Sequence, residues 1–352
     1  MRILHCLSTR EFAGTERHVA ELVNQQALEH DVTILLDRHT IDIRTGDDIC
    51  RYIGPNVRIV HAGRLGYAAT FFWLTRRRTF DVIHTHLGRA SFRARWLAPR
   101  RTPLVATLHN CFVPRVYAAH DGLICVAKWQ LDALPPSSAE NAAVIGNWTC
   151  CAKPDPDRRV RLRKEFGIDD QTFLIGAAGR LVPEKCFDLL IEAFKIANLP
   201  HTKLIIFGDG PEADNLRNRA AANVVFGGYR PDLKQDMVAF DGFVLPSRRE
   251  PFGIVLLEAM ATGLPVCATA AGGVLDLLAA HNECLVKPND RDGLAEGLKR
   301  LRSRQIVAWN MEPYDVAQKA LGIMSFYRET ILKCNKKTSN CDESTTESKN
   351  RV

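Results

Sequence analysis

Three kinds of sequence pattern are missing from this chain of 352 residues, and each absence excludes a class of protein. The longest clearly apolar stretch, Gly66 to Leu74, has nine residues, whereas a membrane-spanning helix needs about 20. No Cys-x-x-Cys pair occurs among the 11 cysteines, which speaks against a zinc ribbon or a thioredoxin-like motif. No Gly-x-Gly-x-x-Gly follows the first predicted strand, so a nicotinamide-dependent dehydrogenase is disfavoured.

A secretory signal is also missing from the amino terminus. Met1 and Arg2 lead directly into the short apolar run Ile3–Ser8, which is typical of a buried strand. Cysteines such as Cys125 lie inside similar strand-like runs, where a thiol packs as a small core residue. We therefore expect a reducing, cytoplasmic compartment without a disulfide framework.

What the chain does contain is an alternation of short β-branched runs, turns and helical patterns, which indicates parallel α/β sheets. Its length and its 46% of hydrophobic residues suit two globular domains. Strands are predicted in two series, which are 2–8, 31–36, 57–61, 81–86, 104–109, 122–127 and 142–147, and then 173–178, 203–207, 223–226, 242–245, 265–268 and 283–286. The main predicted helices are 15–29, 184–197, 211–222, 253–261, 291–301 and 314–332.

The composition changes between the two series. Residues 150–164 combine prolines, aspartates and basic residues, which indicates a linker. We expect a first domain over 1–147 and a second over 148–314. The polar residues 333–352 are expected to form a disordered tail.

Two segments of the second series carry charged residues where a predicted strand ends and a helix begins. In the first, Gly179–Lys185, the cations Arg180 and Lys185 suit a phosphate clamp, although a solvated basic turn is an equal alternative from this segment alone. In the second, Ser247–Met260, Glu250 lies in the loop and Glu258 in an otherwise apolar helix. A carboxylate in an apolar face needs a partner, which could be a pair of ligand hydroxyls or a neighbouring arginine.

Together these segments resemble retaining glycosyltransferases of glycosyltransferase family 4, because Glu250 and Glu258 match the family's E-x7-E motif. The resemblance covers nearly all of residues 1–330. It implies a GT-B architecture, in which two Rossmann-like domains with parallel sheets face a central cleft and the C-terminal helix, about 315–332, packs back onto the first domain.

The resemblance also implies roles for individual residues. Arg180 and Lys185 would bind the donor diphosphate, Glu258 the ribose and Glu250 the donor sugar. The expected catalytic residues are His109, Arg180, Lys185 and Glu250. The expected donor-binding residues are Gly14, Arg180, Lys185, Glu250, Phe252, Gly253, Ile254 and Glu258.

The function implied is a retaining, metal-independent hexosyltransferase that uses a nucleotide sugar, UDP-linked by preference, in cell-surface polysaccharide or lipopolysaccharide synthesis. Two cations can stabilise a leaving diphosphate without a bound metal, and we expect no cofactor. Two alternatives keep the fold: a non-catalytic nucleotide-sugar-binding partner of another transferase, and a sugar-nucleotide epimerase. His84 and His86 share a strand face, yet no cysteine or carboxylate completes a metal site, so no metal is expected.

A basic segment in the first half indicates where the acceptor binds. The segment from Arg64 to Lys128 contains 11 basic and two acidic residues, so its formal net charge is 11 − 2 = +9. It includes the aromatic residues Phe71, Phe72 and Trp73, a pattern that suits a lipid-linked acceptor or an anionic membrane surface. We therefore expect a cytoplasmic protein, peripheral to the inner face of the membrane. A nucleic acid is a less favoured partner than a membrane or a lipid-linked acceptor, because no nucleic-acid-binding fold is evident. The remaining alternative is a basic helix that is simply solvated.

Overall fold

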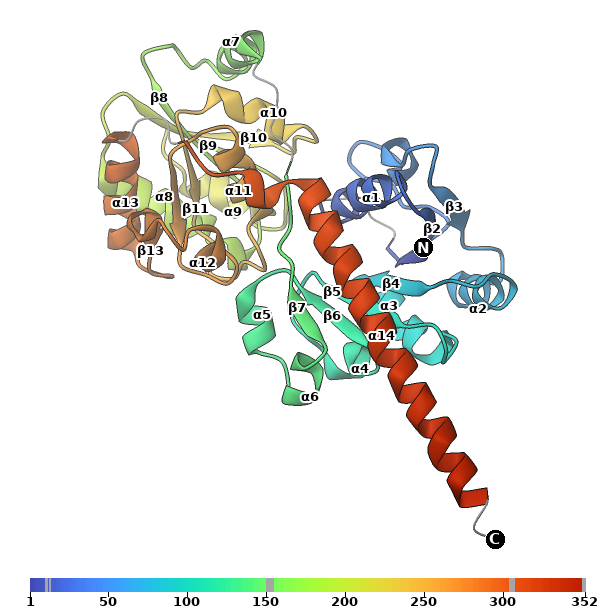
Figure 1. The fold of residues 1–352 in the computed structure, drawn as a ribbon. Helices are drawn as coiled ribbons and strands as arrows, with labels where there is room; N and C mark the ends of the chain where they lie inside the picture. Colours follow the sequence, from blue (N-terminus) through green and yellow to red (C-terminus); the bar gives the residue numbers. More distant parts are fainter. Residues whose placement is uncertain (10–11, 13, 150–154, 304–307, 350–352) are drawn as a thin grey trace. The chain divides into compact units, whose positions relative to one another are not determined.

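The computed structural model describes the whole chain except residues 10–11, 13, 150–154, 304–307 and 350–352. The chain forms two compact units (Figure 1). The first unit contains Met1–Asn147 together with Val316–Val352, and the second contains Trp148–Asp315. The second unit is therefore one continuous segment, inserted between two parts of the first.

The first unit is built on a seven-stranded parallel sheet with the order β3-β2-β1-β4-β5-β6-β7. Most of its strands are buried along nearly their whole length, as the continuous apolar runs in the sequence require of a sheet covered on both faces. The strands are β1 (Arg2–Leu7), β2 (Asp31–Leu36), β3 (Arg58–His61), β4 (Val82–His86), β5 (Leu104–Leu108), β6 (Gly122–Cys125) and β7 (Ala142–Val144).

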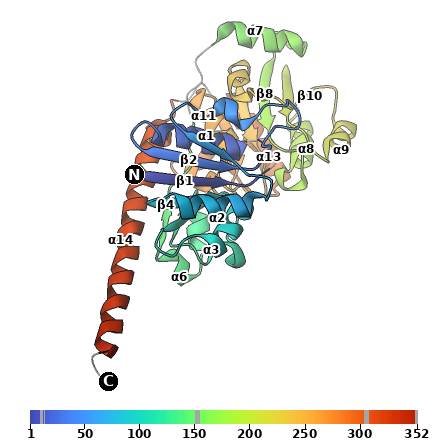
Figure 2. The same ribbon diagram turned by 90° about the vertical axis from the view of Figure 1, so that its right-hand side faces the viewer.

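Helices cover both faces of this sheet (Figures 1 and 2). Leu4 and Cys6 of β1 pack with side chains of α2 and α3 on one face, whereas His5 between them faces α1. Because side chains alternate along a strand, the two faces have different chemistry. The helices are α1 (Gly14–Gln26), α2 (Tyr67–Arg77), α3 (Leu87–Leu97), α4 (Pro114–Tyr117), α5 (Lys128–Asp132), α6 (Pro136–Ala139) and α14 (Val316–Lys349).

The second unit has a six-stranded parallel sheet with the order β10-β9-β8-β11-β12-β13. Its strands are β8 (Phe173–Ala178), β9 (Thr202–Phe207), β10 (Val224–Gly228), β11 (Gly242–Leu245), β12 (Val266–Thr269) and β13 (Leu285–Val286). Its helices are α7 (Pro156–Glu165), α8 (Phe187–Ala197), α9 (Ala213–Arg219), α10 (Leu233–Asp236), α11 (Ile254–Ala261), α12 (Val274–Leu277) and α13 (Arg291–Ser303).

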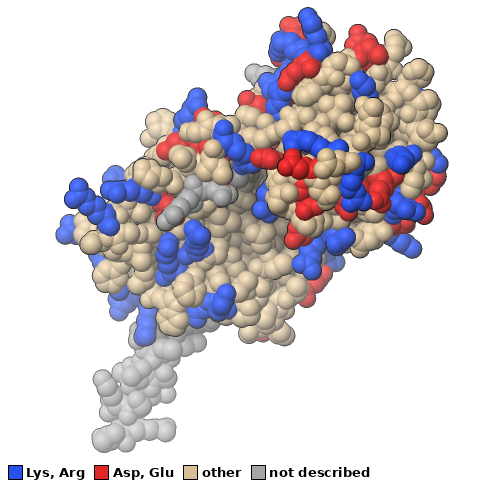
Figure 3. Space-filling model, turned by 180° about the vertical axis from the view of Figure 1, so that it is seen from behind, with Lys and Arg blue, Asp and Glu red and all other residues tan. Residues whose placement is uncertain are grey.

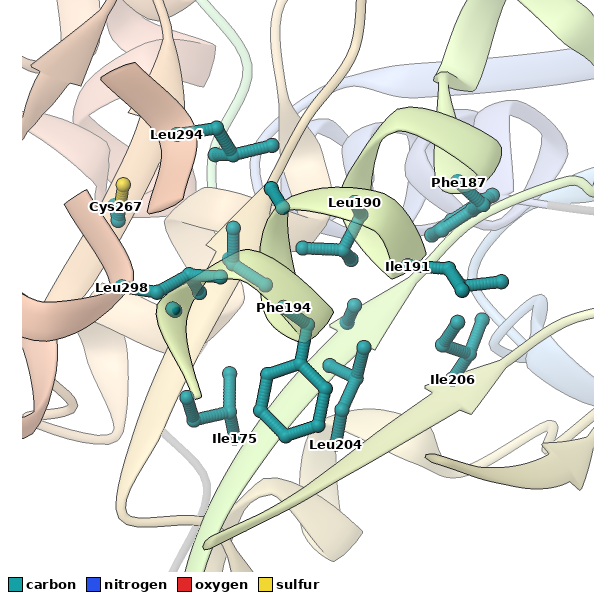
Figure 4. Close-up of a cluster of buried hydrophobic side chains, with 14 of the residues drawn as sticks. Ile175, Phe187, Leu190, Ile191, Phe194, Leu204, Ile206, Cys267, Leu294 and Leu298 are labelled. Carbon is teal, nitrogen blue, oxygen red and sulfur yellow. The ribbon is translucent and has the colours of Figure 1, made fainter. Parts of the chain in front are cut away.

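The core of the second unit lies between its sheet and helix α8 (Figure 4). Leu190 and Phe194 of α8 are buried against Ile175, Leu204 and Ile206 of the sheet. Each such side chain contributes about 1.5–3 kcal/mol when it leaves water. This core holds the ends of β8, β9 and β11 in a fixed relation, and the candidate site is built on those ends.

Of the expected linker over 150–164, residues 150–154 lie outside the described part of the chain, and the expectation is wrong for residues 156–164, which belong to helix α7. The Asp155 side chain accepts a hydrogen bond from the Arg158 N–H at 3.1 Å and caps the helix. Arg163 is buried and donates to the Ala239 carbonyl at 2.9 Å and to Asp241 at 3.2 Å. Arg163, one of the basic residues that suggested a linker, therefore anchors α7 to the rest of the second unit.

The C-terminal helix returns to the first unit, as expected, but it does not end at Leu332. Helix α14 continues to Lys349, so the expectation of a disordered tail is wrong for residues 333–349, and residues 350–352 lie outside the described part of the chain. Residues 333–349 contain neither proline nor glycine, the two residues that most readily end a helix. A polar composition alone was therefore insufficient evidence for disorder.

Candidate active site

The loops that follow β8, β9 and β11 meet at one edge of the second sheet, because these strands are neighbours and run parallel. The Leu181 N–H donates to the Asp209 carbonyl at 2.9 Å, and the Arg248 N–H donates to the Glu184 carbonyl at 2.8 Å. At Gly208 a Cβ atom would lie 1.9 Å from the Gly179 carbonyl oxygen, so only glycine allows this approach. The three loops form a connected frame.

The Lys185 ammonium and the Glu250 carboxylate form an ion pair within this frame, with 2.5 Å between Nζ and Oε2. The Ser247 hydroxyl donates to the same oxygen at 3.0 Å. The Glu250 side chain is 8% exposed and that of Lys185 is 19% exposed. A charge this deep is stable only with a partner, and the partner of Glu250 is Lys185.

The ion pair also determines how many N–H donors of the Lys185 ammonium remain for a ligand. An ammonium has three N–H donors and Glu250 takes one, so two are left for phosphate or hydroxyl oxygens. Arg180 is exposed, and within the described chain its guanidinium makes no hydrogen bond or ion pair. Two cations thus lie in one segment after the end of β8, as the sequence predicts.

The helix expected to open at Glu184 begins three residues later. Pro183–Lys185 forms a single 3-10 turn, Cys186 takes a left-handed conformation with φ 52°, and α8 starts at Phe187. Left-handed backbone interrupts a right-handed helix. Lys185 therefore lies before α8 and not in its first turn, and what it offers a ligand is its side-chain charge.

Helix α11 (Ile254–Ala261) carries Glu258 in its second turn, whereas Glu250 lies in the loop that leads into the helix. Gly253 precedes it with φ 100°, a conformation that strains any other residue. Within the described residues, the N–H groups of Phe252, Gly253 and Ile254 donate to no protein acceptor, so they are available to a ligand. Glu258 is half-buried, as is Ile254 one turn before it, whereas the sequence placed Glu258 in a buried face. A half-buried carboxylate keeps part of its hydration, so the argument that burial forces a partner on Glu258 does not apply.

The first unit contains the other expected site residues. Gly14 is exposed at the start of α1, with open space where a Cβ would lie. His109 follows β5 directly, and its Nε2 lies 3.3 Å from His86 Nδ1. Burial lowers the pKa of His109 to about 4, so this imidazole is neutral at physiological pH.

Sequence reasoning missed a third histidine beside His84 and His86. His5 of β1 is in register with His84 of β4, and one nitrogen from each of the three lies within 4.8 Å of the others. Such a trio could hold a metal ion. However, all six of its ring nitrogens already have hydrogen-bond partners, so a metal would have to displace several of them. The feature that could have pointed to His5 is its position on β1, the strand that pairs with the His84 strand in the parallel sheet.

Comparisons with known proteins agree with this geometry. Residues 159–315 match the family described as glycosyl transferases group 1, and residues 12–144 match glycosyltransferase family 4. Over 255 residues the chain is 30% identical to the putative teichuronic acid biosynthesis glycosyltransferase TuaC of Bacillus subtilis, covering 67% of this chain and 64% of that protein. Over 134 residues it is 35% identical to the lipopolysaccharide core biosynthesis glycosyltransferase LpsE of Rhizobium meliloti, covering 36% and 39%.

The fold has solved counterparts as well. The crystal structure of HepE from Anabaena in complex with UDP superposes with a TM-score of 0.72 at 22% identity, covering 98% of this chain and all of that one. The two units thus have the GT-B fold. Since the two family models together account for most of the sequence, the chain belongs to the group 1 and family 4 glycosyltransferases. The matches span 42%, 64% and 39% of three of its curated relatives.

Proposed function

We propose that this chain transfers a hexosyl group from a nucleotide sugar to a glycan or lipid-linked acceptor during cell-surface glycan synthesis, with retention of configuration. The observation that carries the proposal is the Lys185–Glu250 pair at the meeting point of three strand ends. Lys185 and Arg180 take up the charge of the leaving diphosphate, so the reaction needs no bound metal. Glu250 binds the donor sugar, and Glu258 binds the ribose.

The remaining expected residues complete the proposed donor site. Backbone N–H groups of Phe252, Gly253 and Ile254 contact the sugar and phosphate, while Gly14 and His109 contribute from the first unit. The donor is proposed to be a UDP-sugar, because HepE, which shares the fold, forms a crystalline complex with UDP. The relatives TuaC and LpsE, named for teichuronic acid and lipopolysaccharide core synthesis, support a cell-surface glycan as the product.

A thermal-shift screen against UDP-, GDP- and ADP-sugars tests donor binding. A ligand at 100 times its dissociation constant stabilises the protein by about 2.7 kcal/mol, which is readily measured. Hydrolysis and transfer are then followed with and without a lipid acceptor, and in excess chelator. Donor binding without turnover would favour the non-catalytic partner, and a changed sugar still attached to its nucleotide would favour the epimerase. Loss of transfer in chelator would refute metal independence.

We further propose that the first unit binds an anionic membrane through helices α2 and α3. Phe71 of α2 is core, but Phe72 and Trp73 are 46% and 53% exposed. The guanidinium groups of Arg76 and Arg77 lie over these two rings, at 4.5 and 4.4 Å from the centroids. Figure 3 shows basic side chains over the unit that carries these helices, with few acidic ones among them. An apolar ring beneath a cation suits the boundary between headgroups and acyl chains.

Within the described residues, no helix is long and apolar enough to cross a bilayer, so the proposed contact is peripheral. Vesicle co-sedimentation of the Arg76→Gln/Arg77→Gln variant tests it. At about 1 kcal/mol per basic residue, two lost charges weaken binding to anionic vesicles about 30-fold. Arg78 is left intact because it pairs with Asp31 at 3.6 Å.

The control removes two exposed lysines from the second unit, in Lys195→Gln/Lys287→Gln, and should bind like the parent. Binding should also weaken with salt, because exposed charges are screened within about 10 Å at 0.1 M. Equal binding to zwitterionic vesicles, or equal losses in both variants, would refute the membrane proposal and leave a solvated basic face.

A further inference from the structure

A line of hydrogen-bonded side chains crosses the α1 face of the first sheet and ends at His109. Gln26 Oε1 of α1 lies 2.7 Å from His5 Nε2. His5 Nδ1 lies 3.0 Å from His86 Nε2, and His86 Nδ1 lies 3.3 Å from His109 Nε2. His5 and His86 therefore each contact one neighbour through one ring nitrogen and the next neighbour through the other, whereas His109 ends the line through its Nε2.

The three imidazoles of this line are neutral at physiological pH. Burial lowers the pKa of His5 and of His109 to about 4, and it holds the pKa of His86 well below its usual range. A neutral imidazole has one N–H and one bare nitrogen. Each hydrogen bond between two such rings needs an N–H on one side and a bare nitrogen on the other. In every hydrogen bond of the line the donor must therefore lie on the same side, either always on the side nearer Gln26 or always on the side nearer His109.

Gln26 decides between the two directions. Its amino group lies 3.5 Å from the Met324 sulfur of α14, and a thioether can accept a hydrogen bond but cannot donate one. With the amino group on this side, the Gln26 carbonyl faces His5 and accepts from its Nε2–H.

The arrangement then propagates along the line. His5 donates from Nε2, so its Nδ1 is bare and accepts from His86 Nε2–H. His86 Nδ1 is bare in turn and accepts from His109 Nε2–H. We propose that Gln26, acting through His5 and His86, is a positioning residue that holds His109 in the Nε2–H tautomer with Nδ1 as a bare acceptor.

This tautomer gives His109 a defined chemistry. Among the described residues, His109 Nδ1 has no hydrogen-bond partner, and the side chain is half-buried. A bare nitrogen accepts a hydrogen bond from a hydroxyl, whereas the opposite tautomer would present a donor. That the hydroxyl belongs to the transferred sugar rests on the proposed function. The tautomer of His109 does not rest on the proposed function, because it follows from Gln26 and from the two rings between Gln26 and His109.

The direct test is ¹⁵N NMR of the uniformly labelled protein without any sugar nucleotide, because the shift of an imidazole nitrogen reports whether it carries a proton. The His109→Asn variant assigns the His109 signals. We expect His5, His86 and His109 all to be protonated on Nε2 and bare on Nδ1. A protonated Nδ1 in wild-type His109 would overturn the proposal whether or not the protein binds a donor.

The variant Gln26→Met removes the carbonyl that sets the direction, so the His109 Nδ1 shift should move toward the protonated value. Thr107→Val is the matched control, since Thr107 bonds to His84 Nε2 at 2.7 Å, outside the line. Its His109 signals should match the parent. An unchanged His109 tautomer in folded Gln26→Met would overturn the role of Gln26.

A kinetic measurement extends the test to the proposed reaction. Gln26→Met should lower kcat/KM for the donor sugar about tenfold, the effect of one hydrogen bond, and leave affinity for the free nucleoside diphosphate unchanged. Thr107→Val should change neither. A tautomer shift without this kinetic loss would separate His109 from the sugar while leaving the NMR result in place.

Discussion

Removing Lys185 should damage the fold as well as the activity, because Lys185 neutralises a buried carboxylate. In Lys185→Met the Glu250 side chain, 8% exposed, keeps the Ser247 hydroxyl at 3.0 Å as a partner but loses its counter-charge. Breaking one side of a fully buried pair costs about 3–5 kcal/mol. Because one hydrogen bond remains and Lys185 is partly solvated, we expect the lower end, about 3 kcal/mol.

The reverse change should cost less. In Glu250→Gln the amide can still accept from Lys185 and Ser247, and the ammonium is 19% exposed, so about 1 kcal/mol is expected, the scale of one hydrogen bond. The double variant leaves no unpaired charge and should be more stable than Lys185→Met alone. The difference between the double variant and the sum of the singles is then the coupling energy of the pair.

Urea unfolding of the four proteins measures these free energies. Turnover measured in parallel should fall about 100–1,000-fold in Lys185→Met, since a donor to developing charge is lost. The double variant should regain stability but not activity. If Lys185→Met were no less stable than Glu250→Gln, the carboxylate would not depend on the lysine and the reasoning would be refuted.

Three further outcomes follow from the site and from the histidines. Arg180→Ala should lower turnover about 100–1,000-fold with unchanged stability, because Arg180 is exposed and has no protein partner in the described chain; near wild-type activity would remove it from the diphosphate site. Glu258→Gln should weaken binding of the free nucleoside diphosphate more than Glu250→Gln does, as calorimetry can show, and the opposite order would exchange their roles. Acid should destabilise the first unit: the pKa of His5 is about 4 when folded against 6.5 when unfolded, so its contribution is complete above 6.5 and falls by about 3 kcal/mol as pH drops through 4. Urea unfolding between pH 7 and 4 tests this, and a flat profile would contradict the buried neutral state.

The fold was predictable because most strands of the two sheets are short, largely apolar runs between polar turns. Predicted strands such as 31–36 and 173–178 match β2 and β8 residue for residue, since strands buried on both faces have little pattern ambiguity. Helix ends were less predictable. Cys186 adopts left-handed backbone without being glycine, and nothing in the composition of 333–349 separates a polar helix from a polar coil.

The candidate site was predictable in its residues but not in its contacts. Lys185 and Glu250 are 65 positions apart, and they meet because β8 lies beside β11, an order that no local pattern specifies. The same holds for His5 and His84, which become neighbours through the register of β1 with β4. The half-buried state of Glu258 depends on which side of α11 faces the core, and the apolar residues around it concealed that choice.

The return of α14 to the first unit has a consequence for the order of folding during synthesis. Tyr327 hydrogen bonds to His84 across 243 residues of sequence, and Met324 contacts Gln26 across 298. The second unit lies entirely between these partners, so it emerges from the ribosome and can fold before the first unit is complete. Until α14 arrives, the α1 face of the first sheet lacks the part of its cover that α14 supplies, and His84 lacks its Tyr327 partner. A nascent chain in this state would be the one to need a chaperone.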